Sequence, residues 1–371
     1  MFARFCSGLF YFIFLVACIE VALQGFYYAT AGDFLFRRVG LPIYSREPYA
    51  GYGNHPGLSF NHRTNEFHAH YIINQAGFRV PRLGLEFTKR KAPDTYRIML
   101  LGPSFAFGWG VDYELCFAHM LEQLLQKRRF GGDKEVELIN AGIPAIPTAA
   151  QLAWFEQDGK QYEPDLVIQL VYGSIEIPNI SAPVGFVDNP GYLVSETDTS
   201  MRWREHFKKS AIVFYGWSLW TMLDRSNAAT KSREHGAPVR GTGREMYART
   251  EFDPKNAEVR ESMVVYSRLQ DAARAAGARL LVVFLPLSYA IHPEDESRWR
   301  HLGVVDVTQE AAFNNAFVSY LNKNRIPTLD ITDKLRKSAE SGKRLYFWLD
   351  IHWTPIGNAT AARAVADYLT R

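Results

Sequence analysis

The stretch Ile98-Met99-Leu100-Leu101-Gly102-Pro103-Ser104 runs from four apolar residues directly into a glycine, a proline and a serine. A short unbroken apolar run is typical of a strand buried on both faces, as in a parallel sheet. Working outward, we predict four further strands, at 136–139, 166–171, 280–285 and 328–329. Helical patterns alternate with them, at 113–126, 148–160, 256–276, 309–322 and 355–369. This alternation predicts an α/β fold with a five-stranded parallel sheet.

The amino-acid composition argues against several classes of function. The chain has 371 residues, of which 42 are basic and 39 acidic, giving a formal net charge of +3. So balanced a charge argues against a nucleic-acid-binding protein. Hydrophobic residues make up 47% and charged residues 22%, which is typical of a globular chain and unlike a disordered one. Only Cys116 lies outside the apolar N-terminal run that holds Cys6 and Cys18, so the rest of the chain is expected to contain neither a disulfide nor a cysteine zinc site.

The N-terminal segment, residues 1–31, is predicted to be a membrane anchor. Gly8 to Ile19 is uninterrupted apolar sequence. As a helix, residues 5–28 are about long enough to cross a bilayer, which takes roughly 20 residues. Two alternatives stay open: a cleaved signal peptide, with Ala29-Thr30-Ala31 as the cleavage site, and a buried helix of a soluble protein.

Glu20 is unfavourable in a membrane-spanning segment, because it interrupts the apolar run with a carboxyl group. A carboxylate near the centre of a bilayer costs a few kcal/mol. We therefore expect Glu20 to lie toward the interface, to be protonated, or to pair with a partner helix.

The remaining chain divides into two predicted parts. Residues 32–95 are rich in Gly, Pro, Asn and aromatic residues, with short alternating stretches such as 67–73, and predict a small β-rich lead-in. Residues 96–371 form the predicted α/β domain, in which periodicity is lost at about 181–254, indicating an insertion or cap. Tryptophans 203, 217 and 220 of this cap are expected to pack in a core, with a sugar-stacking or membrane-facing patch as the alternative.

Ligands of parallel α/β sheets bind beyond the carboxyl ends of the strands, so the turns that leave the strands are the places to search. Ser104 in the first turn is positioned as a nucleophile whose own N–H could face an oxyanion. In the second turn, Gly142 would let the backbone approach a ligand closely. In the third turn, Ser174 offers a polar side chain. Each of these residues taken alone is more often simply part of a turn.

An acid and a base precede the last predicted helix. Asp350 and His352 are separated by one residue, so in an extended loop their side chains lie on the same side. The carboxylate can then hold one imidazole nitrogen while the other faces a nucleophile. With Ser104, these residue types complete a catalytic triad.

Taken in order, these motifs resemble the SGNH, or GDSL-like, hydrolase superfamily from about Ala50 onward. Residues 101–111 look like the block that carries the nucleophile, 140–142 like the second block, and 350–357 like the last. The lead-in around 51–53 and 73–79 looks like the segment that precedes the nucleophile in membrane-anchored bacterial members. The resemblance implies a flavodoxin-like three-layer sandwich.

The resemblance also implies roles for residues. Ser104 would be the nucleophile, His352 the base and Asp350 the residue that orients it, while Ser104, Gly142 and Ser174 would supply oxyanion donors. Two positions depart from the family pattern. Pro103 stands where the family usually has aspartate, and the third block lacks the usual asparagine, with Ser174 or Ile175 in its place.

The implied function is that of a serine esterase or O-acyltransferase acting on O-acyl, most often O-acetyl, esters of a glycan or glycolipid in the cell envelope. The domain would face the periplasm or the cell exterior, beside a membrane-bound O-acyltransferase by analogy. No cofactor is implied, and a zinc site at His68 and His70 is disfavoured because no third ligand is evident. The alternative is a non-catalytic pseudoenzyme that serves as a scaffold or binds glycans.

Overall fold

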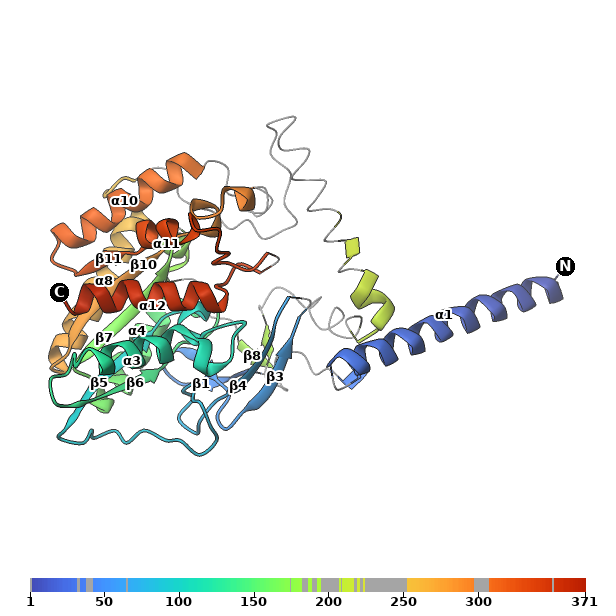
Figure 1. Cartoon of the computed structure of the whole chain (residues 1–371), viewed down its shortest axis with the longest axis horizontal. Helices are drawn as coiled ribbons and strands as arrows, with labels where there is room; N and C mark the ends of the chain where they lie inside the picture. Colours follow the sequence, from blue (N-terminus) through green and yellow to red (C-terminus); the bar gives the residue numbers. More distant parts are fainter. Residues whose placement is uncertain are drawn as a thin grey trace.

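The computed structural model describes residues 2–31, 34–37, 43–64, 66–173, 175–181, 186–188, 192–194, 207, 209–216, 219–220, 223, 252–296, 307–348 and 350–371. A long N-terminal helix extends away from a layered α/β body (Figure 1). Most of the predicted cap at 181–254, including Trp203 and Trp217, lies outside the described residues. The predicted domain boundaries stay a prediction.

A five-stranded sheet forms the centre of the body. Its strands are β5 (Thr95–Leu101), β6 (Glu135–Asn140), β7 (Leu166–Tyr172), β10 (Arg279–Leu285) and β11 (Thr328–Asp330). They lie in the order β11-β10-β7-β5-β6, and every neighbouring pair is parallel. The prediction of five parallel strands is confirmed, because each predicted apolar run lies within one of them.

Helices cover both faces of the sheet. One face packs against α3 (Phe117–Lys127), α11 (Thr332–Ala339) and α12 (Pro355–Leu369), and the other against α4 (Thr148–Gln157), α8 (Ala257–Ala275) and α10 (Val307–Lys323). Alternate residues of one strand serve the two cores: Ile98 and Leu100 join the first, and Met99 and Leu101 the second. This is the expected three-layer sandwich.

Two antiparallel hairpins make up the described part of the lead-in. The first pairs β1 (Tyr44–Glu47) with β2 (Gly51–Asn54), and the second pairs β3 (Ser59–Arg63) with β4 (His68–Ile72). Just after them, the Arg79 N–H donates to the Asn140 carbonyl at 3.1 Å. The lead-in is thereby joined to the end of β6, at the edge of the sheet where the predicted site residues lie.

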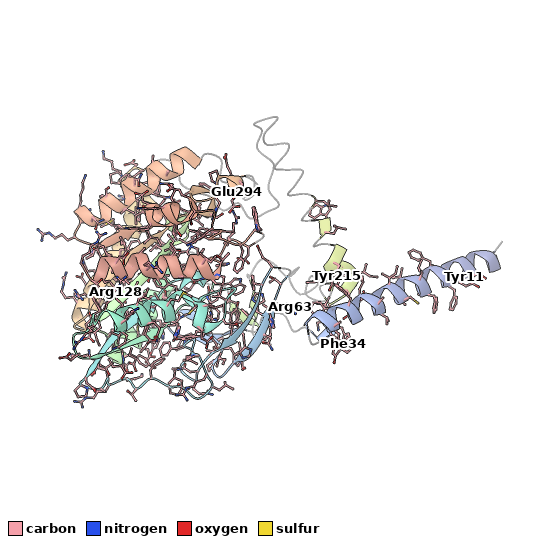
Figure 2. All side chains as sticks on the ribbon, in the orientation of Figure 1. Tyr11, Phe34, Arg63, Arg128, Tyr215 and Glu294 are labelled. Atoms are coloured by element: carbon pink, nitrogen blue, oxygen red, sulfur yellow. The ribbon has the colours of Figure 1, made fainter. Side chains whose placement is uncertain are left out.

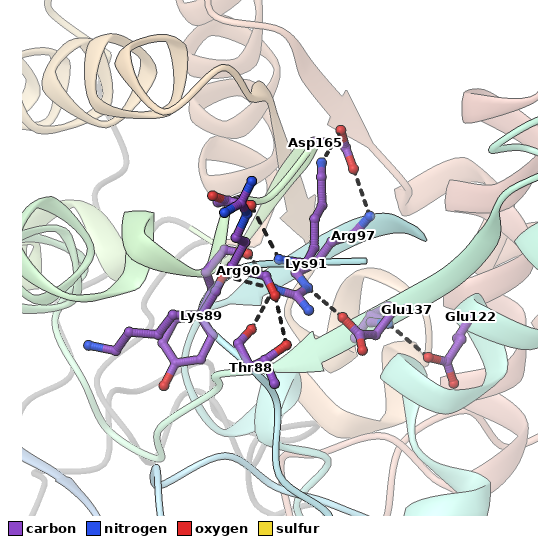
Figure 3. A network of polar contacts seen from close by, with 11 residues as sticks. Thr88, Lys89, Arg90, Lys91, Arg97, Glu122, Glu137 and Asp165 are labelled. Atoms are coloured by element: carbon purple, nitrogen blue, oxygen red, sulfur yellow. Dashed lines mark hydrogen bonds and ion pairs between the residues drawn. The ribbon is translucent and has the colours of Figure 1, made fainter. Parts of the chain in front are cut away.

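At the amino ends of the strands, away from the predicted site residues, the sheet is held by a polar network around Arg97 (Figure 3). The buried Arg97 guanidinium pairs with Glu137 of β6 and donates to the Tyr162 carbonyl at 2.6 Å. Asp165, just before β7, accepts from the Arg97 N–H at 2.8 Å and pairs with Lys91 at 2.5 Å. These contacts join the starts of three neighbouring strands.

Helix α1 (Phe2–Ala31) is the only helix in the described part of the chain that is long and apolar enough to span a membrane, by length and composition. Its apolar span, Cys6–Ala29, has a mean hydropathy of 2.2, and within it Gln24 and Tyr27 are buried by other parts of the chain. Near its end, Tyr27 packs with Ala211 and Phe214 of helical residues 211–216. Trp220, farther along that segment, is 54% exposed, so the expected core packing is wrong for this tryptophan.

Candidate active site

Ser104 lies at the corner where the central strand β5 turns into the short helix α2 (Ser104–Phe107). Gly102 precedes it at φ +138°, a conformation that favours glycine, and a side chain there would meet Leu170 at 3.0 Å. Pro103 takes the N-cap position with φ −76°. The Ser104 N–H belongs to the first turn of the helix, and no described residue accepts a hydrogen bond from it. The corner thus presents a hydroxyl and an open N–H together.

The structure brings Ser104, His352 and Asp350 into one hydrogen-bonded chain. His352 Nε2 lies 2.5 Å from Ser104 Oγ, and His352 Nδ1 contacts the Asp350 carboxylate. With Nδ1 donating to the carboxylate, Nε2 is the nitrogen left to accept the serine proton. The ring of His352 is largely buried between Phe105 and Trp109, at centroid distances of 4.9 and 5.7 Å. The geometry is that of a nucleophile, a base and an orienting acid.

The surroundings of Asp350 favour the ionised form of its carboxyl group. Burial raises its pKa, but the neighbouring charge of His352 and the hydrogen bonds from His352 outweigh burial, so the pKa lies below its ordinary value. One of those bonds comes from the His352 backbone N–H at 2.9 Å. An ionised carboxylate at this place stabilises an imidazolium when His352 takes up a proton.

The loop that carries Asp350 and His352 is fixed at both ends. Tyr346 and Trp353 form an antiparallel bridge across it, and Thr354 caps helix α12 by accepting from the Gly357 N–H at 3.2 Å. A side chain at Gly357 would meet the Leu345 carbonyl oxygen at 2.1 Å, so only glycine allows this close packing. Local capping and packing thus position the acid and the base.

Glu66 also holds this loop, and nothing in the sequence pointed to it. It follows β3 in the lead-in and accepts hydrogen bonds from the backbone N–H groups of Trp348 and Asp350, the latter at 2.9 Å. Its function depends on contacts between parts of the chain far apart in sequence. A single glutamate in a loop carries no local signal for such a role.

The predicted oxyanion donors differ in whether their N–H groups are already hydrogen-bonded. Gly142 donates its N–H to Asn140 Oδ1 at 3.0 Å, so this donor is engaged within its own turn. A side chain at Gly142 would lie 2.3 Å from the Phe107 backbone nitrogen, which shows that glycine is needed there to pack against α2. Ser174 lies outside the described residues. Among the described candidates, Ser104 is therefore the donor left open.

Two buried side chains brace the turns around Ser104. Gln151 accepts from the Gly102 N–H at 2.7 Å and donates to the Ala141 carbonyl at 2.8 Å, which ties the first two turns together. Arg79 donates to the carbonyls of Phe107, at 2.7 Å, and Gly108, at 2.5 Å, at the end of α2. Both residues fix backbone positions, a role that no sequence motif predicted.

His70 does not resemble a metal ligand in this structure. Its Nδ1 contacts Asn61 Oδ1 at 2.7 Å, and its Nε2 contacts Ser59 Oγ at 3.1 Å. Within the described ranges, no group of three His, Cys, Asp or Glu side chains could hold a metal ion.

A buried carboxyl group lies beside the third turn. Glu176 begins the short helix α5 (Glu176–Asn179) and accepts from the Thr148 hydroxyl at 2.6 Å. Burial raises its pKa to about 7, although the hydrogen bonds from Thr148 partly oppose the shift. Burial likewise raises the pKa of Glu122, on α3, to about 7. Both groups therefore keep a proton in the folded state over a range where an unfolded glutamate is ionised.

These two carboxyl groups predict a pH-dependent stability. Between an unfolded pKa of about 4.5 and a folded pKa of about 7, the unfolded chain binds fewer protons, so stability falls as pH rises. Each group contributes at most about 1.4 kcal/mol per pH unit. Glu176→Gln should make the decline shallower, and adding Glu122→Gln shallower still, in thermal unfolding of the detergent-solubilised protein. The exposed Glu340→Gln is the control, and an unchanged slope in the double variant would contradict the prediction.

Comparison with known proteins gives a partial match to one family. Residues 239–371 match the family model described as "SGNH hydrolase-like domain, acetyltransferase AlgX". This match supports an SGNH-like hydrolase, and the α/β body is hereafter called the SGNH-like domain. The matched part of this SGNH-like domain holds Asp350 and His352, and Ser104 lies before it.

Individual relatives of the SGNH-like domain are distant. The chain is 26% identical over 157 residues to "Probable alginate O-acetylase AlgJ" of Pseudomonas fluorescens, a match that covers 41% of this chain and 37% of the length of that relative. Among solved structures, it is similar to the aryl esterase of M. smegmatis, with 13% identity, 73% of this chain and 97% of that chain covered, and a TM-score of 0.38. It is also similar to the esterase EstA of Pseudoalteromonas sp., with 12% identity, 73% and 95% coverage, and a TM-score of 0.36.

Proposed function

We propose that the SGNH-like domain is a serine esterase or O-acyltransferase that forms an acyl-enzyme on Ser104. The observation that carries the proposal is the 2.5 Å contact between His352 Nε2 and Ser104 Oγ, with Asp350 on the other ring nitrogen. This arrangement is the one that activates a hydroxyl for attack on an ester.

The proposed reaction has two halves. Ser104 Oγ attacks the acyl carbonyl carbon while His352 Nε2 takes the hydroxyl proton, and the Ser104 N–H donates to the oxygen that becomes negative. The tetrahedral adduct then expels the alcohol, which receives that proton from His352. The acyl group remains on Ser104 as an ester. Water accepts it in hydrolysis, and a sugar hydroxyl accepts it in transfer.

We propose an O-acetylated carbohydrate or glycolipid of the cell envelope as the substrate. The acetyltransferase family model and the name of the alginate O-acetylase relative support an acetyl group on a carbohydrate. Helix α1 supports a location at a membrane. We propose that the SGNH-like domain faces the periplasm or the cell exterior. A membrane-bound O-acyltransferase that supplies the acetyl group is the proposed partner.

Covalent labelling tests the proposed nucleophile. A fluorophosphonate probe should modify the full-length protein at one serine, and mass spectrometry of peptides should place the adduct on Ser104. Incubation of unlabelled protein with p-nitrophenyl acetate, with and without an oligosaccharide acceptor, separates hydrolysis from transfer. If the acetyl group is recovered only as acetate, the protein is an esterase, and an acetylated oligosaccharide would indicate a transferase.

A second candidate function is that of a non-catalytic, glycan-binding scaffold. The engagement of the Gly142 N–H by Asn140 favours it, because loss of one oxyanion donor lowers the rate by roughly 10² to 10³. Absence of any probe adduct on Ser104, together with retained binding of an oligosaccharide, would replace the enzyme with the scaffold.

A further inference from the structure

Glu20, in the apolar helix α1, is bonded to another part of the chain. Its carboxylate accepts hydrogen bonds from the backbone N–H groups of Ala211, at 2.7 Å, and Ile212, at 3.0 Å, and from the Ser210 hydroxyl at 2.9 Å. These donors lie at the start of helical residues 211–216. Glu20 thus caps the N-terminal end of a helix that comes from the insertion.

Gln24, one turn farther along α1, extends this contact. Its side chain donates to the Lys209 carbonyl at 3.0 Å and to Glu20 at 2.7 Å, and accepts from the Phe36 N–H at 3.2 Å. Aromatic contacts continue it, with Tyr27 and Phe214 at a centroid distance of 5.7 Å. In Figure 2, Tyr215 of the same segment lies beside the end of α1, whereas Tyr11 projects from the bare part.

The position of Glu20 along α1 determines how deep in the hydrocarbon layer of a membrane this contact would lie. The apolar span ends at Ala29, nine residues later, so Glu20 lies about 14 Å from that end at 1.5 Å per residue. The span of 24 residues is about 36 Å long, against a hydrocarbon layer of roughly 30 Å. Even if all the excess length lies on this side, Glu20 remains on the order of 8 Å inside the layer. Residues 210–212, which bond to it, must lie at a similar depth.

The segment that bonds to Glu20 carries apolar side chains on its outside. Phe207 is 57% exposed, Val213 39%, Leu219 58% and Trp220 54%. In water such a surface would be costly, whereas lipid would solvate it beside α1, whose own apolar side chains are also exposed. Trp220 has the amphipathic side chain that is enriched at membrane interfaces.

We propose that the described residues of this segment, 207, 209–216, 219–220 and 223, belong to a second membrane-binding element, which enters the lipid layer beside α1 and packs its exposed apolar side chains against acyl chains. The hydrogen bonds between Glu20 and residues 210–212 offset two unfavourable contributions to the free energy of insertion. Glu20 gains donors inside a layer that offers no water, and the start of the inserted helix gains an acceptor for its open N–H groups. The exported domain is then held to the bilayer at two places rather than on a single tether.

The test measures lipid contact at chosen positions of the full-length chain. Cys6→Ser and Cys18→Ser leave the buried Cys116 as the remaining native thiol. An environment-sensitive fluorophore is attached through Leu219→Cys, Leu83→Cys or Phe14→Cys, and the protein is reconstituted into phosphatidylcholine vesicles with brominated acyl chains. Leu83 is the matched control, because it is 60% exposed on the α/β body, and Phe14, also 60% exposed, reports α1 itself.

Position 219 should behave like position 14, with emission shifted to the blue and intensity lost to the brominated lipid, while position 83 shows neither. The vesicles contain no other protein, so a signal at 219 identifies lipid as the partner. A response at 219 equal to that at 83 would overturn the proposal and would leave a membrane protein as the partner of this surface.

Glu20→Leu tests the link itself. Leucine removes the acceptor but makes α1 more apolar, so quenching at position 14 should persist while quenching at 219 is reduced. Glu20→Gln, which keeps one acceptor oxygen, should give an intermediate loss at 219. Full quenching at 219 in Glu20→Leu would contradict the role of Glu20 in holding the segment at depth.

Discussion

Ser104→Ala should abolish turnover of p-nitrophenyl acetate, with kcat falling by about 10³-fold or more, because no other atom at the corner can carry the acyl group. The fluorophosphonate adduct should disappear as well. The melting temperature should change little, since among the described residues Ser104 Oγ forms a hydrogen bond only with His352.

Ser341→Ala is the matched control for this variant. Ser341 is an exposed serine whose hydroxyl bonds to the Ser338 carbonyl at 2.8 Å, and its loss should leave both turnover and labelling intact. Turnover that survives in Ser104→Ala while Ser341→Ala also remains active would remove Ser104 from the mechanism.

His352→Ala should be nearly as damaging as Ser104→Ala, and the double variant should be no worse than either single variant. The reason is that the nucleophile and the base act as one unit, so their effects on kcat do not add. Asp350→Asn should lower kcat by about 10² to 10⁴, because an amide no longer stabilises the imidazolium. Steady-state kinetics of the four proteins at one saturating ester concentration measures this.

Additive effects of Ser104→Ala and His352→Ala on the free energy of activation would contradict the assignment of the two residues to one catalytic unit. If the double variant lost the product of the two single losses, Ser104 and His352 would act in separate steps. Full activity in His352→Ala would assign the proton transfer to another residue.

The sheet could be predicted from the sequence because its strands are buried on both faces. Each therefore reads as an unbroken apolar run, as in 98–101 and 280–285. Helix α11 was missed, since it has only eight residues and only Leu335 among them is buried. Trp220 was misjudged because a tryptophan in an aperiodic segment looks the same in sequence whether it faces a core or lipid.

The triad residues could be selected for local reasons: Ser104 follows a strand directly, and Asp350 lies two residues from His352. The residues that surround the triad could not be selected from the sequence in this way. Gly142 was chosen as a donor because it would let the backbone approach a ligand closely, yet the structure uses it for close packing against α2. Glu66 and Arg79 act only because the lead-in folds over the end of the sheet, which no local pattern reveals.

The contacts that complete the triad join very distant parts of the chain: Ser104 and His352 are 248 positions apart, and Glu66 and Asp350 are 284. Loop closure over such separations is slow and comes late in folding. During synthesis α1 emerges before the SGNH-like domain, and the His352 imidazole emerges only after most of that domain. We therefore expect a chain that stalls before His352 to have no ester-cleaving power. Reactivity would arise only once His352 has been made and has folded against Ser104, long after α1 has left the ribosome.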